Sequence, residues 1–219
     1  LESVARQTLK TLDLIVVDDC STDHSAQVAC QWAEAHQDRF NRLLVLQNCS
    51  NAGLGPSRNV GFNAAETPYV MPLDADNRLK PDCLDRHLKV ARARQLAFVY
   101  PTIELFGDET GLIGVLPYDP NRLIRGNYID AMALIAKGAW CSVGGYASLQ
   151  PQGWEDFDFW CRLAEQGLAG EALGGAAAAE YRVHGTSMLR TTTDVPAQKG
   201  ALVAEMGRRH PWLALPSVS

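Results

Sequence analysis

Two aspartates separated by one residue, Asp74 and Asp76, are the first side chains in this sequence that could do chemistry together. They follow the apolar run at residues 69–73, which predicts a short buried strand ending in a loop. Two carboxylates at the carboxyl end of a strand can share a divalent cation, and ligands reach open α/β sheets at that edge. A solvated turn is the alternative interpretation, because Asp and Asn favour turns.

A second acidic pair, Glu155 and Asp156, lies at the start of a predicted helix over residues 156–166. A carboxylate in this position can take a proton from a hydroxyl nucleophile, which is the role of a general base. The alternative is that both residues only stabilise the positive end of the helix dipole. Trp154 falls in the loop before this helix, where its ring could stack on a sugar.

Polar residues near two further strands suit a nucleotide. Asp18 and Asp19 close the first predicted strand and can accept hydrogen bonds from a base edge or ribose hydroxyls, although a turn that caps the next helix is also possible. Asn51 and Gly53 precede a predicted helix that carries Arg58, an arrangement that suits a phosphate or a nucleotide. A capped surface helix explains it equally well, and the spacing matches neither the Rossmann nor the Walker glycine pattern.

His184 follows the last predicted strand and is the remaining candidate for chemistry. A single histidine is usually structural. With carboxylates nearby, however, a histidine can complete a metal site.

The elements that must position these residues alternate regularly along the first hundred residues. Strands are predicted at 12–17, 43–46, 69–73 and 98–100, and helices at 25–36, 56–65 and 81–94. This alternation implies right-handed βαβ crossovers. The second half is less regular, with strands predicted at 104–106, 112–116, 129–136 and 181–184 and helices at 138–143, 156–166 and 197–210. The sequence therefore predicts one α/β domain, with a mostly parallel, mixed sheet flanked by helices.

Composition limits the classes of function. The chain has 219 residues, of which 47% are hydrophobic, and its net charge of −5 without a basic cluster argues against nucleic acid as a partner. No apolar run approaches the roughly 18–20 residues of a transmembrane segment. The sequence begins without Met or a signal peptide, and its six cysteines are scattered, which favours free thiols. The expected location is the cytoplasm, with the inner face of the membrane as an option.

Taken in order, these segments resemble the family 2 glycosyltransferases with the GT-A fold. The resemblance covers nearly the whole chain. It lies in residues 15–23 (IVVDDCSTD), 51–53 (NAG), 58–61 (RNVG), 73–76 (LDAD), 144–146 (GGY), 154–162 (WEDFDFWCR) and 181–187 (YRVHGTS). The sequence departs from the family in two respects. Cys20 stands where the family usually has Gly or Asn, and the family's first strand, with its Pro-x-Tyr-Asn-type segment, would precede Leu1.

The resemblance implies a GT-A domain over residues 1–219, with a nucleotide-binding half at 1–100 and an acceptor-binding half with a C-terminal helix at 101–219. It also implies an inverting transfer from a nucleotide-sugar donor to the hydroxyl of an acceptor, with a UDP-sugar as the first choice of donor and a saccharide or lipid-linked molecule as acceptor. The donor diphosphate would be held by Mg²⁺ or Mn²⁺.

Roles for individual residues follow by position in the family pattern. Asp18 or Asp19 would contact the nucleobase, and Asn51, Gly53 and Arg58 would line the nucleotide pocket. Asp74 would bind on the ribose side and help hold the metal with Asp76 and His184. Asp156 would be the general base, Glu155 would help shape the acceptor site, and Trp154 would lie against the sugar.

Three other classes of function remain open on the sequence. A metal-dependent phosphohydrolase could also use Asp74 and Asp76, but the sequence shows neither an aspartyl nucleophile nor a two-metal ligand set. A nucleotide-sugar-binding module, or an inactive truncated fragment, would keep the pocket without transferring sugar. A purely structural interpretation makes every acidic cluster a cap or a turn. Sugar transfer that fails in Asp156→Asn while donor binding persists distinguishes the enzyme from the module.

Overall fold

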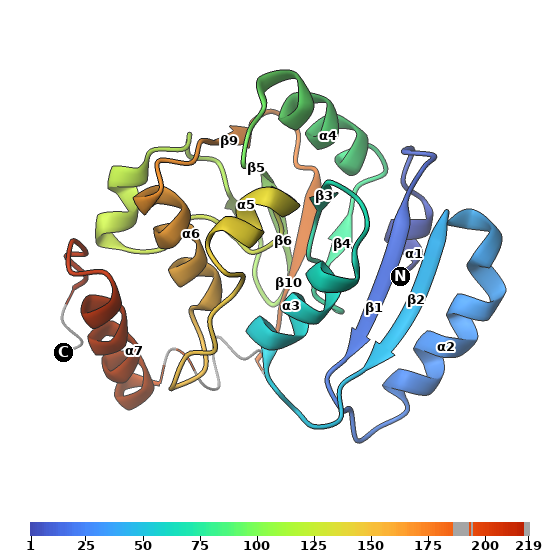
Figure 1. Cartoon of the computed structure of the whole chain (residues 1–219), viewed down its shortest axis with the longest axis horizontal. Helices are drawn as coiled ribbons and strands as arrows, with labels where there is room; N and C mark the ends of the chain where they lie inside the picture. The colour runs from blue at the N-terminus through green and yellow to red at the C-terminus, as the bar shows by residue number, and fades with distance from the viewer. Residues whose placement is uncertain (186–192, 194, 217–219) are drawn as a thin grey trace.

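The computed structural model describes residues 1–185, 193 and 195–216. The first α/β unit of the chain lies at the right of Figure 1. Strands β1 (Asp13–Asp18) and β2 (Arg42–Gln47) pair in parallel, with Asp18 opposite Gln47 at their carboxyl ends. Helix α2 (Ser25–His36) connects them and packs on both, and α3 (Leu54–Ala64) packs against β1. Both candidate aspartates, Asp18 and Asp19, therefore lie at the carboxyl edge, where ligands reach such sheets.

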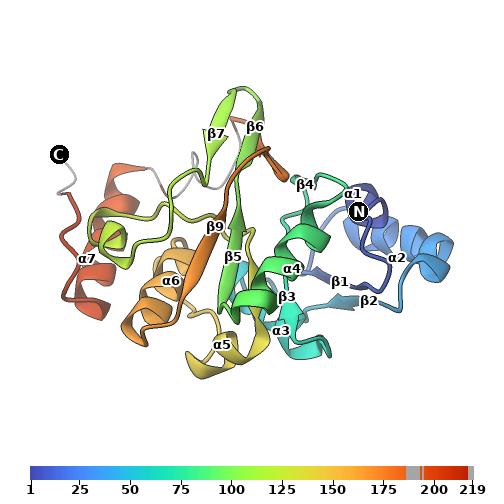
Figure 2. The ribbon, with the colours of Figure 1, turned by 90° about the horizontal axis from the view of Figure 1, so that it is seen from above.

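Two four-stranded sheets form the middle of the molecule. One has the order β3-β8-β5-β9, made of Tyr69–Val70, Leu134–Ala136, Phe98–Pro101 and Gly170–Leu173. The other has the order β4-β10-β6-β7, made of Arg78–Leu79, Ala179–Val183, Ile103–Gly107 and Gly111–Ile113. Figure 2 shows the β6-β7 hairpin projecting from the body of the molecule.

The remaining elements are helices around these sheets. They are α1 (Glu2–Ala5), α4 (Cys83–Arg94), α5 (Lys137–Ser142), α6 (Glu155–Glu165), α7 (Pro196–Arg209) and the 3₁₀ segments Gln37–Arg39 and Pro120–Arg125. Helix α7 lies at the opposite end of the molecule from α1 and α2 in both views (Figures 1 and 2).

The predicted α/β architecture with a mixed sheet flanked by helices is confirmed. Parallel pairing predominates in length, because β1-β2, β10-β6 and β5-β9 pair over six, five and four residues, whereas the antiparallel pairs extend over two or three. The strands of the described residues form three separate hydrogen-bonded sheets, where the sequence led us to expect one.

Two predicted strands are shorter than expected, for identifiable reasons. The strand predicted at 69–73 pairs only over Tyr69–Val70, and Pro72 beyond it has no N–H to donate to a ladder. The strand predicted at 129–136 begins only at Leu134, because the Asp130 carboxylate accepts the N–H of Met132 at 2.8 Å and turns the chain.

An aromatic cluster forms the core between the middle sheets and α6. Phe98, Phe157 and Trp160 are each no more than 1% exposed, and the Phe98 and Trp160 ring centroids lie 4.9 Å apart. Such packed pairs contribute about 0.5–1.5 kcal/mol beyond the burial of their apolar area. Phe157 and Trp160, three residues apart on α6, are thus both buried in this core, which fixes the start of the helix.

Helix α7 is attached to α6 through a buried carboxylate. Asp158 is fully buried and accepts hydrogen bonds from Arg162, Arg209 and His210. Burial opposes its charge, but these cations lower the pKa of Asp158 to about 2. Within the described part of the chain, no helix has the length and hydrophobicity that crossing a bilayer requires.

Candidate active site

Arg58 joins three segments that are distant in sequence. It lies on the second turn of α3, and its guanidinium donates to Glu155 Oε1 at 2.9 Å and to Asp74 Oδ1 at 3.0 Å. Its side chain is only 9% exposed. Burial opposes the positive charge, but Asp74, Tyr146 and Glu155 raise the pKa of Arg58 above its ordinary value. A permanent cation therefore holds α3, the loop after β3 and the first residue of α6 together.

The close approach of α3 to the segment before α6 depends on Gly55. A Cβ atom at this position would lie 2.8 Å from the carbonyl oxygen of Ala147 and 3.5 Å from Glu155 Cβ. Any larger residue would push α3 away from α6. The glycine thus allows the Arg58–Glu155 contact to form.

Asp156, next to Glu155, is half-buried at the start of α6. Its Oδ1 accepts the N–H of Phe157 at 2.8 Å, and its Oδ2 accepts the side-chain amide of Asn127 at 2.9 Å. Burial and the negative charge of Glu155 raise the pKa of Asp156 to about 7, although Arg58 acts in the opposite direction. A carboxyl group with this pKa can accept and release a proton near neutral pH.

Asp18 and Asp19 shape the loops at the end of the β1-β2 pair. Hydrogen bonds from Ser21 and Gln47 outweigh burial and lower the pKa of Asp18. Burial would raise the pKa of Asp19, but the N–H groups of Ala52 and Gly53, at 2.9 and 2.7 Å, lower it overall. Both carboxylates are therefore ionised at neutral pH.

The loop of Asn51 and Gly53 is tied directly to Asp19. The Asn51 side chain donates to the Asp19 carbonyl oxygen at 3.3 Å, and Gly53 adopts a φ of +88° immediately before α3. Together with Asp18, these residues form the rim between the β1-β2 pair and α3. The structure thus brings the candidate nucleotide-pocket residues to one edge.

Asp76, in the loop between β3 and β4, lies beside His184, which follows β10. His184 Nε2 is 3.2 Å from Asp76 Oδ2, and both side chains are partly exposed, at 36% and 42%. One oxygen of Asp74 contacts Arg58. Among the residues that the structure describes, no group of three or more His, Cys, Asp or Glu side chains is arranged to hold a metal ion.

The donor atoms of this pair nevertheless fit a divalent cation of the Mg²⁺ or Mn²⁺ type. A carboxylate oxygen and an imidazole nitrogen at an accessible position are ligands that Mn²⁺ accepts, and Mg²⁺ commonly takes only one or two carboxylates plus substrate phosphates. The exposure of both side chains leaves access for such phosphates. Asp76 and His184, with Asp74 as a third candidate, remain the predicted metal ligands.

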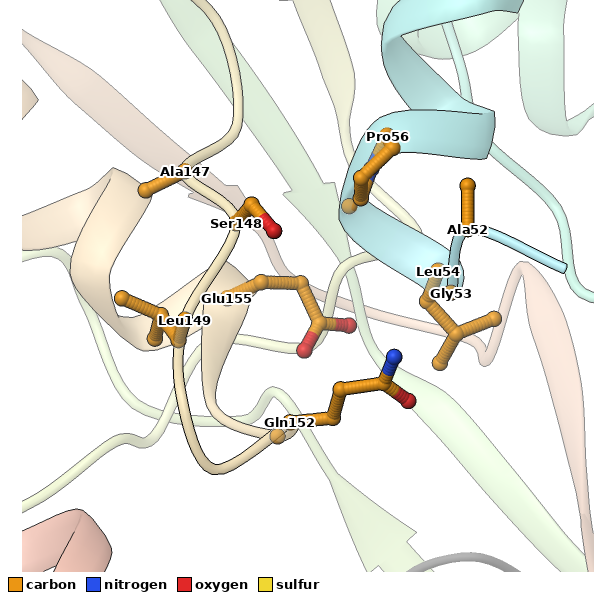
Figure 3. A pocket seen from close by; sticks show the side chains of 11 residues that line it. Ala52, Gly53, Leu54, Pro56, Ala147, Ser148, Leu149, Gln152 and Glu155 are labelled. Carbon is orange, nitrogen blue, oxygen red and sulfur yellow. The ribbon is translucent and has the colours of Figure 1, made fainter.

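A small pocket lies between the first turn of α3 and the segment 147–155. Figure 3 shows the Gln152 amide and the Glu155 carboxylate pointing into the space beside Gly53 and Leu54. The enclosed volume is about 20 Å³, which is little more than one water needs. This pocket is therefore too small for a nucleotide.

Trp154 precedes α6 in a left-handed conformation, with a φ of +58°. Its half-buried ring meets Phe157 edge to face at a centroid distance of 6.0 Å. The indole is thus held by packing at the start of α6. The proposed stacking of Trp154 on a sugar stays a prediction.

Three residues of the site were missed by sequence reasoning. The first is Asn127, which contacts Asp156. The second is the half-buried Asp130, a third carboxylate near Asp74 and Asp156. Burial and the charge of Asp74 raise the pKa of Asp130 to about 6. Tyr146, 3% exposed, lies under Arg58 with its ring centroid 5.7 Å from the guanidinium carbon. The segment Gly144–Tyr146 carried the only usable signal, since it belongs to the family pattern; nothing in the local sequence distinguishes Asn127 or Asp130.

Comparisons with known proteins agree on the fold. The chain is similar to S. aureus TarS in its complex with UDP-GlcNAc, with a TM-score of 0.76 and 17% identity over 95% of this chain and 60% of that chain. A second TarS structure, in complex with UDP, has a TM-score of 0.68 and 19% identity over 94% of this chain and 60% of that one. At these identities the likeness establishes the GT-A fold.

Sequence comparison establishes the family. EpsE of Bacillus subtilis (strain 168), whose name assigns it to the glycosyltransferases, is 29% identical over 179 residues, which is 79% of this chain and 63% of EpsE. The chain thus spans less than two thirds of the length of EpsE and TarS. Residues 1–149 match the family described as Glycosyl transferase family 2. With more than half of its length matched, the chain belongs to glycosyltransferase family 2.

Proposed function

We propose that this chain transfers a sugar from a nucleotide-sugar donor to an acceptor hydroxyl, with inversion at the anomeric carbon and with Asp156 as the general base. The observation that carries the proposal is the setting of Asp156. It is a half-buried carboxyl group with a pKa of about 7, one residue from the Glu155–Arg58 ion pair that fixes the start of α6.

The pKa of Asp156 suits its proposed role. A base whose pKa lies near the working pH is ionised often enough to act and basic enough to take a proton from a hydroxyl group. Direct attack by that hydroxyl on the face of the sugar opposite the leaving diphosphate gives inversion. Glu155, held by Arg58, is proposed to shape the acceptor side without taking the proton.

On the donor side, Asp18 or Asp19 contacts the nucleobase, while Asn51, Gly53 and Arg58 line the nucleotide pocket. Asp74 lies on the ribose side, and Trp154 packs against the sugar. A UDP-sugar is the first choice, supported by the UDP and UDP-GlcNAc complexes of TarS. A saccharide or lipid-linked acceptor is proposed from family membership alone.

Asp76 and His184, with Asp74, are proposed to hold Mg²⁺ or Mn²⁺ at the donor diphosphate. Such an ion, when bound, neutralises the negative charge of the departing nucleoside diphosphate. The 3.2 Å approach of His184 to Asp76 supports this assignment.

The test combines donor binding with sugar transfer. Calorimetric titration with UDP and UDP-sugars, with Mn²⁺ and with a chelator, measures donor binding, and Asp76→Ala should remove its metal dependence. Sugar transfer should fall by at least about 100-fold in Asp156→Asn, with donor affinity unchanged. Asp85→Asn is the matched control, because Asp85 lies on α4 and pairs with Lys89 away from the site.

Two outcomes distinguish the rival functions. Metal-dependent donor binding without transfer to any acceptor tested would favour a nucleotide-sugar-binding module. Transfer that survives Asp156→Asn would refute the base assignment while leaving the family's activity in place.

A further inference from the structure

Asn127 makes a direct contact with the proposed base, and the family pattern does not explain it. It lies in the loop after the 3₁₀ segment Pro120–Arg125, and its Nδ2 donates to Asp156 Oδ2 at 2.9 Å. We propose that Asn127 is a positioning residue for Asp156, holding the carboxylate in one orientation and favouring its ionised form at neutral pH. This inference rests on the proposed function, because it assigns Asn127 to the base of that reaction.

The orientation of the Asn127 amide is fixed by a second hydrogen bond. Its Oδ1 accepts the N–H of Ile129 at 3.1 Å, so the NH₂ group must face Asp156. The loop itself is anchored on α6, because Trp160 Nε1 donates to the Ile129 carbonyl oxygen at 2.9 Å and Ile129 is 1% exposed. Asn127 is therefore held at a set distance from the first turn of α6.

The charges around Asp156 determine how much the neutral Asn127 amide can affect its ionisation. The ionisable groups near Asp156 are Glu155 and Cys161 on its own helix, Arg58 on α3, Asp130 in the loop before β8, Tyr146 after α5 and Tyr181 on β10. Burial and the two carboxylates disfavour the ionised form of Asp156, whereas Arg58 favours it. The hydrogen bonds from Phe157 N–H and Asn127 also favour the charged form, since they are made to a carboxylate acceptor.

The size of the effect follows from the hydrogen bond. A hydrogen bond to a charged acceptor is stronger than one to a neutral acceptor, and the exposure of Asn127 limits the effect on the proton affinity of Asp156 to about tenfold. Loss of this hydrogen bond should raise the pKa of Asp156 by about one unit. Starting from a pKa of about 7, the ionised fraction at pH 7 would fall about fivefold.

The primary measurement is an NMR titration of the Asp156 side-chain carboxyl carbon, assigned by its disappearance in Asp156→Asn. Wild type, Asn127→Ala and Asn121→Ala are compared. Asn121 is the control, because its side chain bonds only Asp119 among the described contacts and lies outside the site. The titration midpoint should rise by about one pH unit in Asn127→Ala and stay unchanged in Asn121→Ala. Equal midpoints in wild type and Asn127→Ala would overturn the proposal.

A pH–rate profile provides the functional readout. In Asn127→Ala, kcat/KM should fall about fivefold at pH 7 and return to the wild-type plateau about two pH units higher. A plateau that drops without a shift of the acidic limb means a purely structural role and refutes the proposal. If Asn127→Ala does not fold, the isosteric Asn127→Asp replaces it; its added negative charge should raise the midpoint further. If wild type transfers no sugar, the proposed function fails, while the carboxyl titration still decides the role of Asn127.

Discussion

Arg58→Met should destabilise the protein far more than the loss of an exposed arginine. Removing one member of a buried ion pair leaves the partner without compensation and costs about 3–5 kcal/mol. Glu155 would be left in this state, since its side chain is 9% exposed, whereas Asp74 is 38% exposed and would regain solvent. We therefore expect the lower value, about 3 kcal/mol, which for a chain of this size lowers Tm by roughly 6–12 °C.

Urea unfolding of wild type, Arg58→Met and Arg94→Met measures this difference. Arg94 pairs with Glu171 at the surface and is 62% exposed, so its loss should cost no more than about 1 kcal/mol. Replacing Glu155 by Gln in the Arg58→Met background should recover about 1 kcal/mol or more, because the uncompensated charge is removed. The reasoning is refuted if Arg58→Met loses no more stability than Arg94→Met.

Three further predictions concern stability. His87 is fully buried, and burial lowers its pKa. Because the imidazole then binds a proton near pH 6.5 only in the unfolded chain, the unfolding free energy of wild type relative to that of His87→Gln should fall as pH drops below this value; a difference that does not change with pH in urea unfolding would contradict this. Gly145→Ala should lower the free energy of unfolding by about 1–3 kcal/mol more than Gly144→Ala does. Both glycines have a φ near +75°, but only a Cβ on Gly145 would meet a neighbour, Asn59 Oδ1 at 2.7 Å. Equal losses of stability in thermal melts would contradict this. Cys20 has a φ of +61°, a conformation that Asn tolerates and a β-branched residue does not. Cys20→Asn should therefore raise the free energy of unfolding by about 0.5 kcal/mol, and Cys20→Val should lower it by about 1 kcal/mol. Equal melting temperatures of the two variants would exclude backbone strain at this position.

The sequence predicted the elements whose pattern is local. Helix α2 was predicted with its observed bounds, and α4 and α7 were predicted within two residues at each end. Strand β9 was missed, because Gly170–Leu173 (GEAL) is poor in the residues that favour strands and is stabilised by its pairing with β5. The expectation that all six cysteines are free is confirmed.

The candidate site was predicted as a set of residues, but its contacts were not. The ion pairs of Arg58 with Asp74 and Glu155 depend on the packing of α3 against α6, which no local pattern expresses. Asn127 and Asp130 were missed for the same reason, since each lies in an irregular loop. The unusual residue Cys20 acquires a physical explanation: its left-handed backbone is the conformation that Gly and Asn adopt most readily.

The Arg58 bridge also bears on how this protein can be recombined. Its two partners lie 16 and 97 residues away along the chain, on either side of residue 100. In a chimera that joins residues 1–100 to the second half of another family member, the buried Arg58 would keep Asp74 but would need a new partner in place of Glu155. Such a hybrid requires an acidic residue at the position of Glu155, and a backbone at the position of Ala147 that lies as close to Gly55 as it does here. Exchange of the second half of the chain is thus constrained by electrostatic and steric complementarity between α3 and α6.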